Sequence, residues 1–197
     1  MNELNPIRIW GNWKEGYALD WHTLKSIYLG VDEWGHNQYE TTRSKLGEMV
    51  YQLKYNQNIS VLDEMIHLIA PFLDWWNISS KVSAIIPVPP SNINRIFQPV
   101  FEICNKLSEY LAIPLYTEFL IKNNHIQSKN LDRINKIEIS GSIKRRLRFQ
   151  TEVNVLLIDD LFQTGSTLTE CVKILKTDSH IRDIFVLTMT KTRRVNK

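Results

Sequence analysis

The pattern of hydrophobic and polar residues divides this chain into segments of two kinds. Apolar residues recur at helical spacing, with one buried stripe in each segment, over residues 41–55, 60–75 and 95–112 and again after residue 167. Short, continuous apolar runs with the length of buried strands cover residues 82–90, 153–158 and 184–190. Helical segments that alternate with buried strands predict an α/β fold, with a mainly parallel twisted sheet flanked by helices.

The first forty residues are rich in aromatic side chains and follow neither pattern over any length. Glycines separate the aromatic residues, and their order indicates two or three short strands in a hairpin or small sheet. We expect most of these rings to fill the core of that sheet; the alternative is a platform on which a planar base or a partner stacks. The sequence thus predicts an aromatic-rich N-terminal β element, residues 1–40, and an α/β domain, residues 41–197.

Composition limits the function classes only mildly. With 197 residues and a formal net charge of +3, the chain suits a small polyanionic ligand, and the charge is too small to indicate nucleic-acid binding by itself. Both cysteines, Cys104 and Cys171, fall in apolar helical patterns, and two cysteines cannot form a four-cysteine zinc site. No signal peptide, lipidation motif or apolar run of membrane length is present, so we expect a soluble, cytoplasmic protein.

The most informative stretch begins with the strand over residues 153–158. Two adjacent carboxylates, Asp159 and Asp160, follow that strand, and the turn Gln163 to Thr167 then leads into a helical pattern. In open α/β sheets, ligands bind where strands end and helices begin. N–H groups at the start of a helix, hydroxyl side chains and a glycine that permits close approach together suit a phosphate.

The carboxylates of Asp159 and Asp160 indicate a different part of the ligand. They would repel a phosphate, but they can accept hydrogen bonds from hydroxyl groups, directly or through a hydrated Mg²⁺. A ligand that carries a phosphate beside vicinal hydroxyl groups satisfies both halves of the stretch. Ribose 5-phosphate is such a ligand.

Other classes of protein also place acidic residues after a buried strand. A P-loop NTPase would need the G-x-x-x-x-G-K-[ST] motif upstream, and this chain contains no Gly-Lys pair. A receiver domain normally carries its acidic pair near its start. A purely structural turn, with Ser or Thr capping the helix, does not account for two aspartates at a strand end. A hydrolase or phosphatase that uses Asp159 and Asp160 as metal ligands stays open.

The stretch Val155 to Thr167 resembles the phosphoribosyl pyrophosphate motif of type I phosphoribosyltransferases. That motif has four apolar residues, two aspartates, two variable residues and Thr-Thr-Gly-x-Thr, and Gln163 stands here in place of its first Thr. The resemblance implies the fold of that family, and it implies that Asp159 and Asp160 are catalytic, contact the ribose hydroxyls and hold Mg²⁺ through water. It implies 5′-phosphate contacts from Gln163, Thr164, Gly165, Ser166 and Thr167.

The same resemblance assigns a role to one further segment, and polarity and length suggest a role for another. It implies that the proline-rich loop after the strand over residues 82–90 binds pyrophosphate, with contacts from Val88, Pro89, Pro90, Ser91 and Arg95. A long polar segment, residues 122–136, would close over the pyrophosphate and exclude water, with Lys122, Lys129 and Arg133 as its candidate cations. The alternative for that segment is an ordinary solvated loop.

Several stretches narrow the resemblance to the ComF family of phosphoribosyltransferase-like competence proteins. They span roughly residues 45–190 and comprise Leu46 to Tyr55, Pro87 to Pro89, Arg95 to Gln98, and the series Gln127, Leu131 and Arg133. The four-cysteine zinc element of that family is absent, a tryptophan-rich segment stands in its place, and the family's Arg-Gly-Phe-Asn-Gln sequence is altered. A homodimer and a DNA-processing protein are the macromolecular partners that we consider.

The expected function is Mg²⁺-dependent binding of phosphoribosyl pyrophosphate and transfer of its phosphoribosyl group to an unknown acceptor, such as a nucleobase, with release of pyrophosphate. The alternative is a non-catalytic accessory protein of competence or DNA uptake that senses phosphoribosyl pyrophosphate. Such a protein would bind its partner through the aromatic N-terminus or the basic cluster at residues 144–148, although a charge run of this kind is usually a solvated surface.

Overall fold

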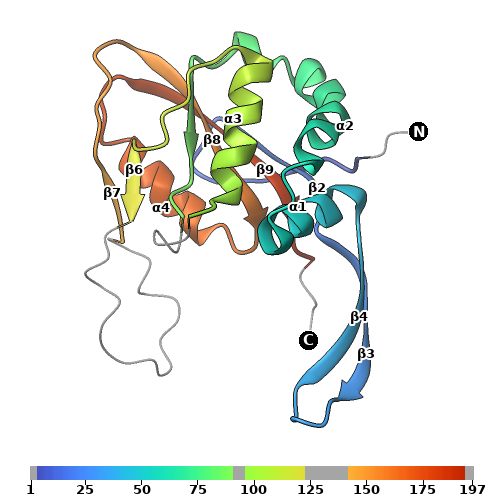
Figure 1. Ribbon diagram of the computed structural model, residues 1–197. Coiled ribbons are helices and arrows are strands. Elements are labelled where there is room, and N and C mark those ends of the chain that lie inside the picture. The colour runs from blue at the N-terminus through green and yellow to red at the C-terminus, as the bar shows by residue number, and fades with distance from the viewer. Residues whose placement is uncertain (1–3, 91–95, 123–141, 194–197) are drawn as a thin grey trace.

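A five-stranded sheet forms the centre of the molecule, in the order β1-β2-β9-β8-β5 (Figure 1). The computed structural model describes residues 4–90, 96–122 and 142–193. The strands of this sheet are β1 (Ile7–Arg8), β2 (Glu15–Trp21), β9 (Ile181–Lys191), β8 (Val153–Phe162) and β5 (Ala84–Pro87). All neighbouring pairs except β1 and β2 are parallel, which confirms the predicted α/β fold with a mainly parallel sheet.

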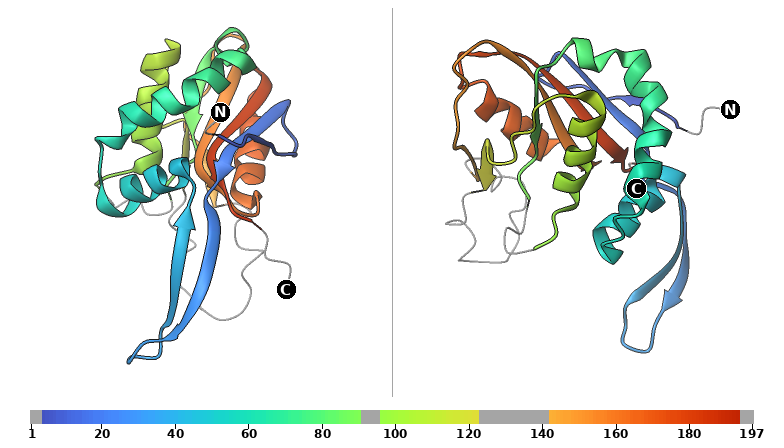
Figure 2. Two further views of the ribbon diagram at one scale, coloured as in Figure 1. Left: turned by 90° about the vertical axis from the view of Figure 1, so that its right-hand side faces the viewer. Right: turned by 45° about the horizontal axis from the view of Figure 1, so that its top comes forward.

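Helices cover both faces of this sheet (Figure 2). One face carries a short 3-10 helix, Ile78–Ser80, and the helices α1 (Lys45–Asn56), α2 (Val61–Trp76) and α3 (Pro99–Leu111). The opposite face carries α4 (Ser166–Leu175) and a small antiparallel pair of strands, β6 (Leu120–Lys122) and β7 (Ile143–Arg145). None of the helices in the described ranges is long and apolar enough to cross a membrane.

Strand β8 lies between two hydrophobic cores. Leu156 and Ile158 pack into the core beneath α1, α2 and α3, whereas Val155 and Leu157 pack into the core beneath α4. Successive side chains thus point to opposite faces, as they do in any strand. Because the strands beside β8 run parallel to it, the C-terminal ends of β2, β5, β8 and β9 meet at one edge of the sheet.

Two prolines mark where the helices differ from expectation. The predicted helix over residues 95–112 begins at Pro99, because a residue before proline is disfavoured in the helical region and Gln98 is extended, with φ −115° and ψ 99°. Pro99 then occupies the first turn, where a missing N–H removes no intrahelical bond. Pro71, which we expect to kink the second helix or end it early, lies inside α2 and does not end it.

The first forty residues contribute to two different structures. β1 and β2 join the central sheet, so the expected division at residue 40 does not separate two sheets. β3 (Thr23–Val31) and β4 (Asn37–Arg43) form a hairpin, called the arm (residues 23–43), that projects from the body of the molecule (Figures 1 and 2). Its aromatic rings are exposed, including Tyr28 at 54% and Trp34 at 74%. The rings of the arm therefore do not fill a core, contrary to expectation.

Candidate functional site

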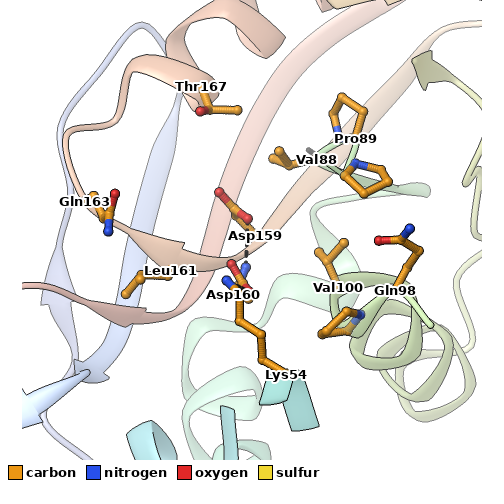
Figure 3. Close-up of a pocket in the computed structure, with 12 residues that line it drawn as sticks. Lys54, Val88, Pro89, Gln98, Val100, Asp159, Asp160, Leu161, Gln163 and Thr167 are labelled. Atoms are coloured by element: carbon orange, nitrogen blue, oxygen red, sulfur yellow. Dashed lines mark hydrogen bonds and ion pairs between the residues drawn. The ribbon is translucent and has the colours of Figure 1, made fainter. Parts of the chain in front are cut away.

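The two predicted acidic residues lie within the last part of strand β8, not after it. The strand continues to Phe162, and Asp159 is aligned with Thr188 of β9. Strand alternation places Asp160 on the same face as Ile158, toward α1, and Asp159 on the α4 face. Figure 3 shows the Asp160 side chain directed toward Lys54, with Asp159 on the side of the pocket that carries Thr167. The two carboxylates therefore have different neighbours.

Asp160 forms an ion pair with a lysine that the sequence did not identify. Lys54 Nζ donates to Asp160 Oδ2 at 2.7 Å, and the exposed fractions of the two side chains are 32% and 15%. Burial by itself lowers the pKa of Lys54, but the charge of Asp160 outweighs that effect, and the Lys54 pKa is raised. Lys54 is thus charged in the folded protein and partly neutralises the acidic pair.

Asp159 has the more enclosed carboxyl group. Burial, followed by the adjacent charge of Asp160, raises the pKa of Asp159 well above its usual value. Its Oδ1 turns back along the strand and accepts a hydrogen bond from the Asp160 backbone N–H at 2.9 Å. Asp159 lines both pockets, where a carboxyl oxygen can meet a ligand hydroxyl.

The predicted phosphate turn forms as a left-handed step into helix α4. Gly165 has φ 79° and is the N-cap residue, and the helix begins at Ser166. A Cβ atom at residue 165 would lie 2.9 Å from Phe162 Cζ, so both backbone conformation and space require glycine there. Thr164 Oγ1 and Ser166 Oγ lie 2.8 Å apart. The first N–H groups of α4, which lack intrahelical acceptors, and these hydroxyls are donors of the kind that can bind an anion.

Two adjoining pockets open beside the acidic pair. One, of about 270 Å³, is formed by Asp159 and the residues of the turn from Leu161 to Leu168. The other, of about 300 Å³, is lined by the residues that follow: Lys54, Val88, Pro89, Pro90, Gln98, Pro99, Val100, Asp159, Asp160, Leu161, Gln163 and Thr167 (Figure 3). Asp159 lines both pockets, whereas Asp160 lines only the second. A ligand with two anionic ends can therefore place one end in each pocket, with its middle beside Asp159.

The structure brings most of the predicted residues together. The acidic pair, the turn from Gln163 to Thr167 and the proline loop from Val88 to Pro90 all line these pockets. Ser91, Arg95, Lys129 and Arg133 lie outside the described residues. Lys122 lies in β6, and it is not among the residues that line either pocket.

Sequence reasoning gave no site role to Lys54 or to the beginning of α3 at Gln98, Pro99 and Val100, although Lys54 and Gln98 lie in stretches that carry the family resemblance. Lys54 directly follows Leu53 of the buried stripe of α1, and this position alone only weakly indicates a residue of the site. The α3 residues were expected inside a helix rather than at its first turn. Their place in the pocket wall depends on Pro99, which sets the start of the helix.

A short chain of hydrogen bonds connects the Asp160 backbone to Thr190 of β9 and to His22, which follows β2. Thr190 Oγ1 of β9 donates to the Asp160 backbone oxygen at 3.3 Å, and His22 Nδ1 lies 3.1 Å from the same hydroxyl. Because the Thr190 proton is used in the first bond, His22 Nδ1 must be the donor in the second. Burial, followed by the nearby cation of Arg43, lowers the pKa of His22, which favours the neutral ring.

The donor set of the site fits one mode of Mg²⁺ binding. Within the described ranges, no group of three or more His, Cys, Asp or Glu side chains could enclose a metal ion. Mg²⁺ typically keeps several waters and binds through one or two carboxylates plus the phosphates of a substrate. Asp159 and Asp160 can supply those carboxylate oxygens, so the residues suit a hydrated ion that arrives with a phosphorylated ligand.

Comparison with known proteins finds similarity only among solved structures. No family model and no curated protein matches the chain. Orotate phosphoribosyltransferase from Aeropyrum pernix matches with 15% identity and a TM-score of 0.43, over 86% of this chain and 76% of that one. An adenine phosphoribosyltransferase matches with 12% identity and a TM-score of 0.45, over 83% and 85%.

A third match is a longer protein. UMP synthase from Leishmania donovani is 13% identical, with a TM-score of 0.40, and the match covers 84% of this chain but 28% of that one. At these identities and TM-scores, the likeness does not decide the function of this chain. The functional argument therefore rests on the residues of the site itself.

Proposed function

We propose that this protein binds phosphoribosyl pyrophosphate with Mg²⁺ and transfers the phosphoribosyl group to an acceptor, with release of pyrophosphate. One observation carries the proposal: the carboxylate of Asp159 and the glycine turn that begins α4 line the same pocket at the end of strand β8. The first suits ribose hydroxyls and the second suits a phosphate. The motif from Val155 to Thr167, which resembles that of type I phosphoribosyltransferases, has the same two parts in the same order.

Each end of the ligand has a matching part of the site. The turn from Gln163 to Thr167 would hold the 5′-phosphate through helix N–H groups, hydroxyls and the helix dipole. Asp159 and Asp160 would accept hydrogen bonds from the ribose hydroxyls. The second pocket, with Val88, Pro89 and Pro90 on its wall, would take the pyrophosphate, and Ser91 and Arg95 are proposed to complete that side.

The chemistry needs positioning more than a strong nucleophile. Breaking the bond between C1 of the ribose and pyrophosphate develops positive charge on the ring and negative charge on the leaving group. Bound Mg²⁺ supplies positive charge to the leaving group. The chain's own contribution is to hold the ribose and phosphate in one orientation and to surround the departing anion with cations, for which Lys122, Lys129 and Arg133 are proposed.

A binding experiment on the acidic pair tests this proposal. Changing both Asp159 and Asp160 to Asn keeps the size of the side chains but removes their charge, so the variant should fold and lose phosphoribosyl pyrophosphate binding. Circular dichroism checks the fold, and calorimetry measures the affinity. Unchanged affinity in the folded double variant would contradict the proposal. Release of pyrophosphate in the presence of a series of nucleobases then identifies the acceptor.

The arm favours a second candidate function, that of a non-catalytic accessory protein. It exposes Tyr28, Leu29 and Tyr39 on its strands and Trp34 in its turn, each more than half exposed, and an exposed apolar surface of this kind commonly marks a protein interface. Such a protein would bind phosphoribosyl pyrophosphate and a partner, either a second copy of the chain or a DNA-processing protein. If the protein binds phosphoribosyl pyrophosphate tightly but releases pyrophosphate with none of the acceptors tested, this function is favoured over the transferase.

A further inference from the structure

Lys54 belongs to helix α1, far in sequence from the acidic motif, and it still contacts the centre of the site. We propose that Lys54 is a positioning residue whose ammonium group is the built-in cation of the acidic pair. In this role it holds the Asp160 carboxylate on the α1 side of β8 and takes the place of a metal ion in the ligand-free protein. The inference rests on the proposed function for the identity of the ligand.

The geometry of the ion pair supports this role. Lys54 Nζ lies 2.7 Å from Asp160 Oδ2, which is the distance of a charge-assisted hydrogen bond. Asp160 is only 15% exposed on its side chain, so solvent screens the pair weakly. One carboxylate oxygen of Asp160 is thus occupied by a cation before any ligand binds. Of the two aspartates, only Asp159 lines the pocket formed by the phosphate turn, so the cation contacts the aspartate that lies farther from that turn.

The charge distribution of the pocket indicates why such a cation is needed. Among the described residues that line the larger pocket, Lys54 is the only lysine or arginine, and it stands against two carboxylates. Phosphoribosyl pyrophosphate is itself strongly anionic. Without Lys54, the approach of this ligand to Asp159 and Asp160 would be repulsive unless a metal ion intervened.

The ion pair is not what holds α1 in place. The helix is anchored by buried side chains, including Leu46, Val50 and Leu53, and by its N-cap Ser44, which donates to the Trp21 backbone oxygen at 2.6 Å. A methionine at residue 54 would keep the apolar stem and remove only the charge. We therefore expect Lys54→Met to fold, and an effect on the site would not come from loss of the helix.

Ribose 5-phosphate is the probe that isolates this part of the site, because it lacks the pyrophosphate that carries Mg²⁺. Its affinity is measured by calorimetry in EDTA and in saturating Mg²⁺. In EDTA, Lys54→Met should bind about tenfold more weakly than wild type, because the anionic ligand then meets an Asp160 charge that no cation offsets. Saturating Mg²⁺ should restore most of that loss, and Lys54→Arg should stay close to wild type.

The matched control is Lys45→Met in the same helix. Lys45 pairs with Glu64 at 3.3 Å on the surface, where the two side chains are 46% and 61% exposed, and it does not line either pocket. This variant should bind ribose 5-phosphate as the wild type does in both buffers. Equal affinities of wild type and Lys54→Met in EDTA would overturn the inference, as would a loss that Mg²⁺ does not reduce.

A second readout separates this inference from the proposed function. Mn²⁺ alone, followed by electron paramagnetic resonance, should bind the acidic pair of Lys54→Met but not that of the wild type, and Asp160→Asn in the Lys54→Met background should abolish the gain. If the wild type binds neither ribose 5-phosphate nor phosphoribosyl pyrophosphate, the proposed function is wrong. Gain of the Mn²⁺ site then still supports the role of Lys54, and absence of the gain overturns it.

Discussion

The Asp159 carboxylate accepts a hydrogen bond at 2.9 Å from the backbone N–H of Asp160, the residue that follows it in strand β8. Of the two aspartates, Asp159 lines both pockets, whereas Asp160 lines only the larger one. Asp160 instead meets Lys54. Two adjacent aspartates of the same motif thus have different surroundings: Asp159 lines both pockets, and Asp160 contacts helix α1 through Lys54.

Gly165 offers a test of the phosphate turn. Gly165→Ala would place a Cβ atom 2.9 Å from Phe162 Cζ at a φ of 79°, so the variant strains the turn and displaces the Phe162 ring or the turn itself. We expect a loss of stability of about 1–2 kcal/mol from the left-handed conformation and loss of ribose 5-phosphate binding. Chemical denaturation and calorimetry measure the two effects.

The arm provides a matched control for that variant. Gly35 has nearly the same φ, 81°, but a Cβ atom there would meet nothing within 4 Å. Gly35→Ala should lose a similar amount of stability in the turn of the arm and keep the affinity for ribose 5-phosphate. Equal affinities of the Gly165→Ala variant and the wild type would show that this turn does not bind the phosphate.

Ser44 connects helix α1 to the central sheet. Its side chain is 5% exposed, accepts a hydrogen bond from Gly47 N at 2.9 Å and donates to Trp21 O at 2.6 Å. Ser44→Ala should lower the free energy of unfolding by about 1–2 kcal/mol, since an N-cap bond and a buried partner are both lost. Ser60 is the control, because it is the N-cap residue of α2 without a side-chain capping bond. If Ser60→Ala costs as much, capping is not the cause.

Asp178, which lies between α4 and β9, should contribute to the stability of the protein at acidic pH. Burial alone would raise its pKa, but hydrogen bonds from His180 and Phe149 and the charge of Arg145 outweigh burial, so the pKa is lowered. A lowered pKa in the folded state means that the stabilisation is present above the ordinary value of 3.8 and is lost as the pH falls through the folded-state pKa.

The corresponding variant is Asp178→Asn. At neutral pH it should lower the free energy of unfolding by about 2 kcal/mol, because the hydrogen bonds to a buried, charged carboxylate are weakened. On acidification, the free energy of unfolding should also fall less in the variant than in the wild type. Denaturation curves at a series of pH values measure both effects. Parallel pH profiles of the variant and the wild type would contradict this account of Asp178.

The features that the sequence predicted correctly are the local ones. The apolar run, acidic pair and glycine turn of residues 153–167 are adjacent in the chain, and their strand, turn and helix form largely as expected. Pro99 shows how one local rule can move a boundary: it shifts the start of α3, and this shift brings Gln98 into the wall of the pocket.

The features that the sequence did not reveal depend on distant contacts. Lys54 meets Asp160 across 106 positions, and nothing in the pattern around Lys54 specifies that partner. The pairing of β2 with β9 joins the two ends of the chain in the same way. The arm was misjudged for a different reason: aromatic and β-branched residues predict strands equally well whether their faces are buried or exposed.

The central claim is that the pocket at the end of β8 binds phosphoribosyl pyrophosphate. The most direct test is a calorimetric titration of the wild-type protein with this ligand, with and without Mg²⁺, beside the Asp159 and Asp160 double variant. We expect saturable binding to a single site that strengthens with Mg²⁺ and disappears in the double variant. A folded wild-type protein that takes up no ligand in either buffer would contradict the claim and leave the arm as the feature to follow.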